Sequence, residues 1–399
     1  MPVIPGLLES FEDIKAVYSC LAGEEAAGGR CGLFIGEHTH SFSGEVVVEI
    51  ARFFCLHAGL PLPQDSIAGP MNAVGTPTGG GQVFAPELFS ADGDVATVPG
   101  FISIPTRIAE AATQRATERP PLSPTALRAQ LHELLGLPQR LAGPYYRNLK
   151  PRPDVGAGTY GRCAVETEDG IEAILLKDVV AERPSRINRS LDVEEAAAVL
   201  LVPDLSASAE LCLVDRVAAD EAVYAVDLRG VGASLAGPVG PDGYGAEYQI
   251  HAHHLMLGES LLGKRVFDLL QVMQLLRAEA TTPGFTLRLV GRGNGALVAA
   301  FAALLDTGDV SVDLIHAPLS CASWAEEALC TWPAGSVLRG MLQHFDLPDL
   351  YNALGPGRLR IFDPWTAQMS AVPDAVGECA RRGVQAGLLH PSVAAAAKL

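Results

Sequence analysis

The sequence predicts an α/β protein with a doubly wound, mostly parallel sheet, and three observations lead to this prediction. From about residue 122, short apolar runs typical of buried strands alternate with helical patterns. One of these runs, at 286–290, ends in Gly291, Gly293 and Gly295, and a helix of small residues follows at once. Hydrophobic residues make up 48% of the 399 residues and charged residues 19%, which indicates a globular chain with a large core.

The N-terminal part of the chain follows a different pattern. Helical apolar spacing covers 11–22, a short buried strand is expected at 31–36, and an amphipathic helix is expected at 43–59. The loop between that strand and the second helix carries two histidines. Residues 61–121 contain many Gly and Pro residues, so we expect a linker with little periodic structure there.

The remaining elements follow in regular order. A helix is expected at 123–135, because Ser123 is a good N-cap and a proline follows at the first helical position. Strands are expected at 159–167, 170–177, 197–202, 222–230, 286–290, 310–316 and 358–363, and further helices at 246–278 and 295–305. Ligands of such a sheet are expected beyond the carboxyl ends of its strands.

Composition excludes several classes of function. The net charge of −17 disfavours binding to nucleic acid or to an anionic membrane surface. The first residues lack the basic and apolar regions of a secretory signal, and the longest apolar stretch is broken by arginines, so we expect a cytoplasmic chain without a membrane span. Eight cysteines are scattered without C-x-x-C spacing, which predicts reduced thiols and no zinc site. No cofactor is expected.

The glycine-rich turn after 286–290 has the spacing of a nucleophile elbow. In such an elbow, Gly-x-Ser-x-Gly forms a strained turn between a strand and a helix and presents the serine above the sheet. Here Gly293 stands in the position of the serine, and it has no side chain with which to attack a substrate. The scaffold of the elbow is therefore present without its nucleophile.

Several segments resemble the α/β-hydrolases of the acetyl-xylan-esterase-like group, as found in large bacterial two-lobe esterases. The resemblance covers roughly residues 122–370. Its matching segments are Val226–Gly232, Met256–Asp268, the glycine-rich turn, Gly340–Asp349 and Phe362–Pro364. The resemblance implies an α/β-hydrolase fold and a Ser-His-Asp triad that acts on carboxylic esters.

Residues 31–59 resemble the strand, histidine loop and helix that normally follow the acid of that triad. Here this unit precedes the elbow, so it is out of family order. The order fits either a truncated upstream hydrolase domain or a permuted chain whose N-terminal unit completes its own sheet. We therefore divide the chain into the unit 1–60, the linker 61–121 and the hydrolase-like domain 122–399.

The resemblance implies three positions for the triad. His40 is the candidate general base, with His38 as its alternative, because an imidazole can carry a proton near neutral pH. Asp363 is the candidate acid, since it follows the strand at 358–363. Thr366 stands where the family has its second aspartate, so Asp374 is a further candidate. Gly293 marks the nucleophile position.

Other motifs offer weaker alternatives. Ser320 and Cys321 follow a strand and could present a nucleophile to the same cleft. The histidines at 251, 253 and 254 suggest a metal site, but a solvated helix face explains them better because further ligands are missing nearby. Residues 291–296 fit G-x-G-x-x-A, which would favour a nucleotide.

Together these patterns favour an α/β-hydrolase-fold protein related to carboxylic-ester esterases, with an incomplete triad. If the chain is active, its substrate is expected to be a small-molecule or carbohydrate ester. The alternative is an inactive structural or binding lobe that pairs with a complete hydrolase domain or with a second copy. A nucleotide-binding protein is a minor alternative.

Overall fold

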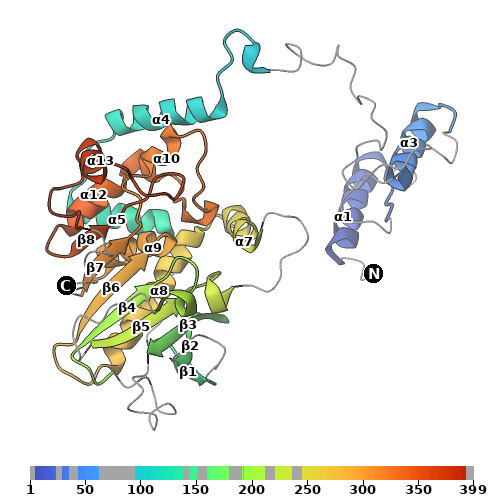
Figure 1. Cartoon of the computed structure of the whole chain (residues 1–399). Helices are drawn as coiled ribbons and strands as arrows, with labels where there is room; N and C mark the ends of the chain where they lie inside the picture. The colour runs from blue at the N-terminus through green and yellow to red at the C-terminus, as the bar shows by residue number, and fades with distance from the viewer. Residues whose placement is uncertain are drawn as a thin grey trace. The chain divides into compact units, whose positions relative to one another are not determined.

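The computed structural model describes residues 5–23, 29–35, 44–62, 95–137, 143–150, 160–178, 191, 193–211, 221–235, 245–308 and 310–391. The chain divides into two compact units, Met1–Phe101 and Ile102–Leu399, which are drawn in Figure 1. None of the described helices is long and apolar enough to cross a membrane.

The N-terminal unit contains two long helices. They are α1 (Pro5–Ala22) and α3 (Gly44–Ala58), which confirm the two helices expected there, and a short 3-10 turn η3 follows at Val95–Thr97. The strand expected at 31–36 is wrong for its described part, because residues 31–35 pair with no other described strand. An extended segment becomes a strand only when a neighbour accepts and donates its backbone hydrogen bonds.

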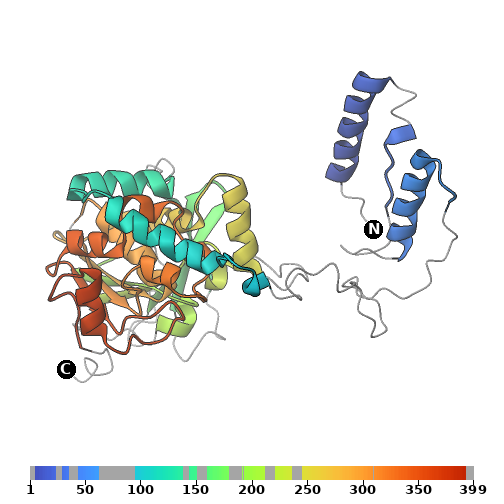
Figure 2. The ribbon, with the colours of Figure 1, turned by 90° about the horizontal axis from the view of Figure 1, so that it is seen from above.

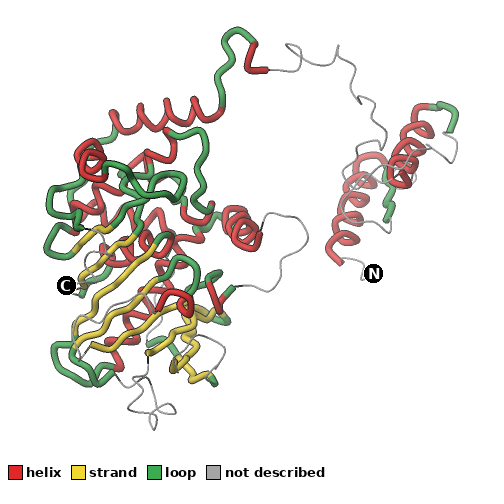
Figure 3. Tube along the Cα trace, viewed as in Figure 1, coloured by secondary structure: helices red, strands yellow, loops and turns green. Residues whose placement is uncertain are grey.

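The C-terminal unit is built on an eight-stranded sheet (Figures 1 and 3). Its strands are β1 (Tyr146–Leu149), β2 (Tyr160–Glu168), β3 (Ile171–Asp178), β4 (Ala197–Val202), β5 (Glu221–Asp227), β6 (Thr286–Arg292), β7 (Val310–Ile315) and β8 (Leu359–Phe362). Their order is β1-β2-β3-β5-β4-β6-β7-β8. The first four strands in this order pair antiparallel, and the pairs from β5 to β8 are parallel. This is the α/β-hydrolase arrangement, and it confirms the predicted fold class.

The helices of this unit are α4 (Ile104–Glu118), α5 (Pro124–Leu135), α6 (Ala207–Glu210), α7 (Gly245–Met256), α8 (Leu261–Glu279), α9 (Asn294–Leu305), α10 (Ala322–Glu326), α11 (Met341–His344), α12 (Leu347–Leu354) and α13 (Ala375–Arg382), with 3-10 turns η6 (Gly232–Ser234) and η7 (Ala334–Ser336). The long helix expected at 246–278 is two helices. It breaks before Ser260, whose hydroxyl accepts the N–H of Gly263 and starts α8.

Helix α4 lies within the segment 61–121 that was expected to lack periodic structure. It begins after Ser103, an N-cap whose hydroxyl accepts the N–H of Thr106. The helix packs against α10 and α11 of the C-terminal unit (Figure 2). The Gly and Pro residues that suggested a linker are concentrated before residue 100, so that interpretation extended too far along the chain.

The core surrounds the central parallel strands. Helix α9 is buried from Gly295 to Leu305, and α8 is buried along most of its length. Their side chains pack with α5, α12 and one face of the sheet into the larger apolar cluster. The opposite face carries a smaller cluster that includes Val199, Val223 and Val290. Burial of both faces explains why β4 and the interior of β5 are continuous apolar runs in the sequence.

A short segment extends the sheet beyond β8. The N–H of Ile361 donates to the carbonyl oxygen of Leu388 over 2.7 Å, and the N–H of His390 donates to that of Ile361 over 2.9 Å. The ring of His390 lies 5.6 Å from that of Phe362. The chain thus places one more extended segment parallel to β8.

Candidate functional site at the elbow turn

The turn between β6 and α9 has the geometry of a nucleophile elbow. Gly293 has φ 51° and ψ −119°, a conformation that costs an ordinary residue strain, and its N–H donates to the carbonyl oxygen of Ile315 over 2.9 Å. A Cβ on Gly295 would lie 2.6 Å from the carbonyl oxygen of Pro203, and one on Gly291 would lie 2.7 Å from the Cα of Ala296. Both flanking positions therefore require glycine, as in an elbow that packs a helix tightly against the sheet.

The space above Gly293 is filled by Asp204, which follows β4. A Cβ built on Gly293 would lie 2.9 Å from the Cβ of Asp204 and 2.5 Å from its Cγ. These distances are shorter than any contact between non-bonded carbon atoms. No side chain fits at position 293 unless Asp204 moves, so the missing nucleophile and the position of this carboxylate are one structural feature.

Asn294 holds the carboxylate of Asp204 in place. Its backbone N–H donates to Oδ1 over 2.9 Å and its side-chain amide donates to the same oxygen over 2.8 Å. The amide oxygen of Asn294 accepts the hydroxyl of Ser336, a buried residue of η7, over 2.5 Å. This second contact fixes the orientation of the amide, because only one end of it can then face Asp204.

A second carboxylate, that of Glu210, accepts hydrogen bonds from two backbone N–H groups of the loop after β4. It is buried and accepts the N–H groups of Asp204 and Leu205 over 3.1 and 2.7 Å. Arg292 forms an ion pair with it over 3.1 Å. An oxyanion hole uses the N–H after the nucleophile together with an N–H of a neighbouring loop. In this chain, side-chain carboxylates already occupy all three of these donors.

A cavity of about 180 Å³ opens beside the elbow. Its wall is mainly apolar and comes from the ends of β4 and β5, from the turn after β5, and from α7, α8 and α9. The lining residues are Val202, Pro203, Asp204, Leu205, Val226, Leu228, Gly230, Val231, Gly232, Leu235, Glu247, Arg265, Asn294, Gly295 and Val298. It lies beyond the carboxyl ends of parallel strands, where ligands of this fold class are expected.

His316, directly after β7, is a site residue that the sequence analysis passed over. Its backbone has φ 61°, and its ring stacks on Trp365 with centroids 4.3 Å apart. Nδ1 is buried and has no hydrogen-bond partner among the described residues. Burial lowers the pKa of His316 below its ordinary value, and the cation of Arg292 lowers it further against the opposing carboxylate of Asp363. The only signal in the sequence was a histidine at the end of an apolar run.

Asp363 lies at the end of β8, at the edge of the sheet where the acid was expected, with φ 45°. Thr366 closes a local turn, because its N–H donates to the carbonyl oxygen of Ser370 and the two hydroxyls lie 2.9 Å apart. Asp374 caps α13 through the N–H of Gly377. Asp374 therefore has a structural role as the N-cap of this helix.

His40 and His38 lie outside the described residues. Gly293 and Asp363 follow β6 and β8, so they lie at the same edge of the sheet, at the carboxyl ends of its parallel strands. The place of His40 stays a prediction.

Ser320 and Cys321 are structural residues. Ser320 is 1% exposed, and its hydroxyl donates to Oδ2 of Asp346 over 2.5 Å. Asp346 also accepts the N–H of Cys321 and caps α12. Burial raises the pKa of the Cys321 thiol well above its ordinary value, and the Asp346 carboxylate adds to this shift. Neither side chain is presented to the cavity as a nucleophile.

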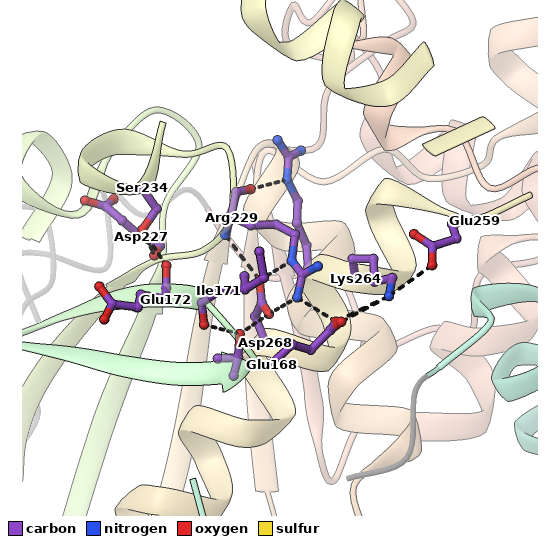
Figure 4. A network of polar contacts seen from close by, with 11 residues as sticks. Glu168, Ile171, Glu172, Asp227, Arg229, Ser234, Glu259, Lys264 and Asp268 are labelled. Carbon is purple, nitrogen blue, oxygen red and sulfur yellow. Dashed lines mark hydrogen bonds and ion pairs between the residues drawn. The ribbon is translucent and has the colours of Figure 1, made fainter. Parts of the chain in front are cut away.

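A buried ion network braces the turn after β5 (Figure 4). Asp268 of α8 is fully buried and accepts hydrogen bonds from Thr167 over 2.6 Å and from Nε of Arg229 over 2.8 Å. Arg229 also contacts Glu168 over 2.9 Å, and Lys264 reaches the same carboxylate over 3.2 Å. Burial opposes ionisation of Glu168, but the two cations outweigh it and lower its pKa. The network ties β2, β5 and α8 together and does not face the cavity as a reacting group.

The hypotheses of a metal site and of a nucleotide site receive no support at this site. Among the described residues, no group of His, Cys, Asp and Glu side chains could hold a metal ion, and Nδ1 of His254 bonds to the carbonyl oxygen of Ile250. A nucleotide at the G-x-G-x-x-A turn would place its phosphate on the first N–H of α9. That N–H, of Asn294, is taken by Asp204, whose negative charge would repel a phosphate.

Solved structures of several esterases are similar to this chain. A scan against protein-family models finds no match, and a search of curated proteins finds none. Among solved structures, a protein assigned as an acetyl xylan esterase from Bacteroides fragilis is similar at 15% identity and a TM-score of 0.49, over 77% of this chain and 86% of that one. Acetyl xylan esterase 1 from Thermoanaerobacterium is similar at 13% identity and 0.38, over 70% and 90%. A glucuronoyl esterase from Solibacter usitatus is similar at 12% identity and 0.36, over 59% and 72%. The first two are named as acetyl xylan esterases, and at these identities the likeness is one of fold.

Proposed function

We propose that the C-terminal unit, an α/β-hydrolase-fold domain related to carboxylic-ester hydrolases, does not hydrolyse esters and acts as a binding lobe. The observation that carries this proposal is the position of Asp204. Its carboxylate stands where a nucleophile would attack, and it accepts the N–H that would stabilise the oxyanion.

The losses in kcat that such changes cause in hydrolases support the absence of ester hydrolysis. Removing a single oxyanion donor costs about 10²–10³-fold in kcat. Removing the nucleophile of a triad costs about 10⁶-fold. Here Gly293 supplies no nucleophile, the donors of Asn294 and Leu205 are occupied, and a fixed negative charge stands where negative charge would have to develop.

The binding role rests on what the elbow retains. The glycines around the turn, the fixed amide of Asn294 and the cavity beside it form an ordered and mainly apolar site. An elbow kept only for packing would not require a cavity lined by Asp204 and Asn294. The expected pairing with a complete hydrolase domain or a second copy of this chain stays part of the proposal.

The test is labelling of the purified full chain with a fluorophosphonate, read by intact mass and peptide mapping. An active serine hydrolase in the same tube controls for the reagent, and circular dichroism controls for folding. We expect no stoichiometric adduct. A stoichiometric adduct on any serine would overturn the proposal and identify the nucleophile, and Ser320→Ala would then show whether that serine carries it.

A further inference from the structure

We propose that the cavity beside the elbow binds a small organic cation, with its ammonium group at Asp204 and a compact apolar body in the cavity. This inference rests on the proposed function, because a site used for ester hydrolysis would need to stabilise negative charge instead. The argument combines the size and lining of the cavity with the balance of charges around it.

The size of the cavity defines the size of the ligand. An enclosed apolar cavity of roughly 150 Å³ binds benzene. The cavity here measures about 180 Å³, which fits a six-membered ring with one or two further atoms. Its apolar wall includes Val202, Leu228 and Val298, side chains that would be in contact with such a ring. Polar groups gather at few positions on this wall, as is usual for a site that orients a small ligand.

The charge of the cavity comes from Asp204. Oδ1 accepts two hydrogen bonds, both from neutral groups of Asn294, and Oδ2 accepts none from a described residue. No described Lys, Arg or His forms an ion pair with Asp204. The side chain is half-buried, so water screens its charge less than it would on the surface. A carboxylate in this environment favours a cation that can donate hydrogen bonds to the open oxygen.

The other charges near the cavity are already balanced. Glu247 forms an ion pair with Arg265 over 2.8 Å, and the same guanidinium donates to the carbonyl oxygens of Arg229 and Gly230. Glu210 forms its ion pair with Arg292. The arginine side chains near the cavity are therefore already paired with carboxylates of the protein. Asp204 has no such partner among the described residues, so its carboxylate leaves an excess negative charge that faces the cavity.

The experiment compares three probes of one shape on the full chain at neutral pH. Benzylamine is the cation, benzyl alcohol its neutral counterpart and benzoate its anionic counterpart. Isothermal titration and ligand-observed NMR measure their affinities. We expect benzylamine to bind about 10-fold or more tightly than benzyl alcohol, benzoate to bind more weakly than either, and the preference to decrease as salt is added.

Two variants locate the site. Asp204→Asn keeps the shape and an acceptor oxygen but removes the charge, so benzylamine should fall to the affinity of benzyl alcohol. Val231→Phe adds volume at the partly exposed rim of the cavity and should weaken all three probes, which keeps the test valid if Asp204→Asn folds poorly. Asp374→Asn removes one carboxylate at the start of α13 and is the matched control, which should leave all three affinities unchanged.

Several results would overturn the inference. The first is that benzylamine does not bind at concentrations up to about 10 mM. The second is that benzoate binds as tightly as benzylamine or more tightly. The third is that neither cavity variant changes the binding of benzylamine. These results differ from a failure of the proposed function, which a fluorophosphonate adduct would reveal. An unlabelled chain without a preference for the amine would contradict this inference alone.

Discussion

The backbone N–H of Asn294 donates to Oδ1 of Asp204 over 2.9 Å, across 90 residues of sequence. In an α/β-hydrolase elbow the same N–H stabilises the oxyanion that forms during acyl transfer. The carboxylate of Asp204 thus satisfies a donor that would otherwise be left at the start of α9, where the helix dipole also favours a negative charge. The absence of a side chain at Gly293 is what leaves room for this arrangement.

A side chain at position 293 should destabilise the fold. Gly293→Ala places a Cβ against Asp204 and forces a non-glycine residue into a strained conformation. We expect the free energy of unfolding to fall by about 2 kcal/mol or more, since strain and overpacking each cost roughly 1–3 kcal/mol. Urea denaturation measures the change.

The matched background for this test is Asp204→Gly, which removes the colliding side chain. In that background, Gly293→Ala should retain only the cost of backbone strain. Equal losses in the two backgrounds would show that Asp204 does not occupy the space above the turn.

Asp268→Asn should be strongly destabilising. The fully buried carboxylate balances Arg229, and its removal leaves a largely buried guanidinium without its main counter-charge. Breaking a buried ion pair in this way costs about 3–5 kcal/mol. Glu259→Gln is the control, because Glu259 is an exposed partner of Lys264 and its loss should cost no more than about 1 kcal/mol. Similar effects of the two substitutions would contradict the bracing role of the network.

Much of the fold was predictable because its central strands are buried on both faces. Strand β4 and the interior of β5 are continuous apolar runs, and β4 has the predicted bounds 197–202. Strand β1 was missed, since Tyr146–Leu149 is a run of only four residues at the edge of the sheet, with two exposed residues between two half-buried ones and no alternating pattern. A short edge strand forms through its pairing with β2, and that pairing leaves little trace in local sequence.

The candidate site was less predictable for a related reason. The elbow is a local motif, so Gly293 was identified from its neighbours alone. The roles of Asp204 and Glu210 depend on contacts between β4, its following loop and α9, and nothing in the sequence near Asp204 marks it. Ser320 illustrates the opposite error. Its place after a strand suggested a nucleophile, while its hydroxyl is bound to Asp346 inside the core.

The thiols should react according to their burial. Burial raises the pKa of Cys163 to about 12 and shifts the pKa of Cys321 in the same direction, so neither forms a reactive thiolate at neutral pH. Cys20 is exposed. We expect iodoacetamide to label Cys20 in the native chain and to label the two buried thiols only after denaturation, as read by peptide mapping. Rapid native labelling of Cys321 would restore it as a candidate nucleophile.

Protonation of His316 should lower stability as the pH falls. Burial and Arg292 lower its pKa in the folded chain, whereas the unfolded chain takes up this proton near the ordinary value of 6.5. Below that value the unfolded state binds more protons, so stability rises with pH. The contribution of His316 is fully present above about pH 6.5 and is lost as the pH falls through this value toward the folded pKa. The carboxylates of Asp363, Asp204 and Glu210 oppose the shift without reversing it.

The measurement is the free energy of unfolding between about pH 5 and pH 8, for the wild type and for His316→Asn. Asparagine tolerates the positive φ of this position and does not titrate. The pKa of His251 is also lowered by burial, so both chains keep the slope that this residue contributes, and only the difference between the two chains reports on His316. We expect the variant to have the shallower slope. Because the ring of His316 stacks on Trp365, the wild type should also show a change in tryptophan fluorescence over this range that the variant lacks. Identical slopes would mean that the His316 ring takes up its proton as readily in the folded chain as in the unfolded one, and that burial does not lower its pKa.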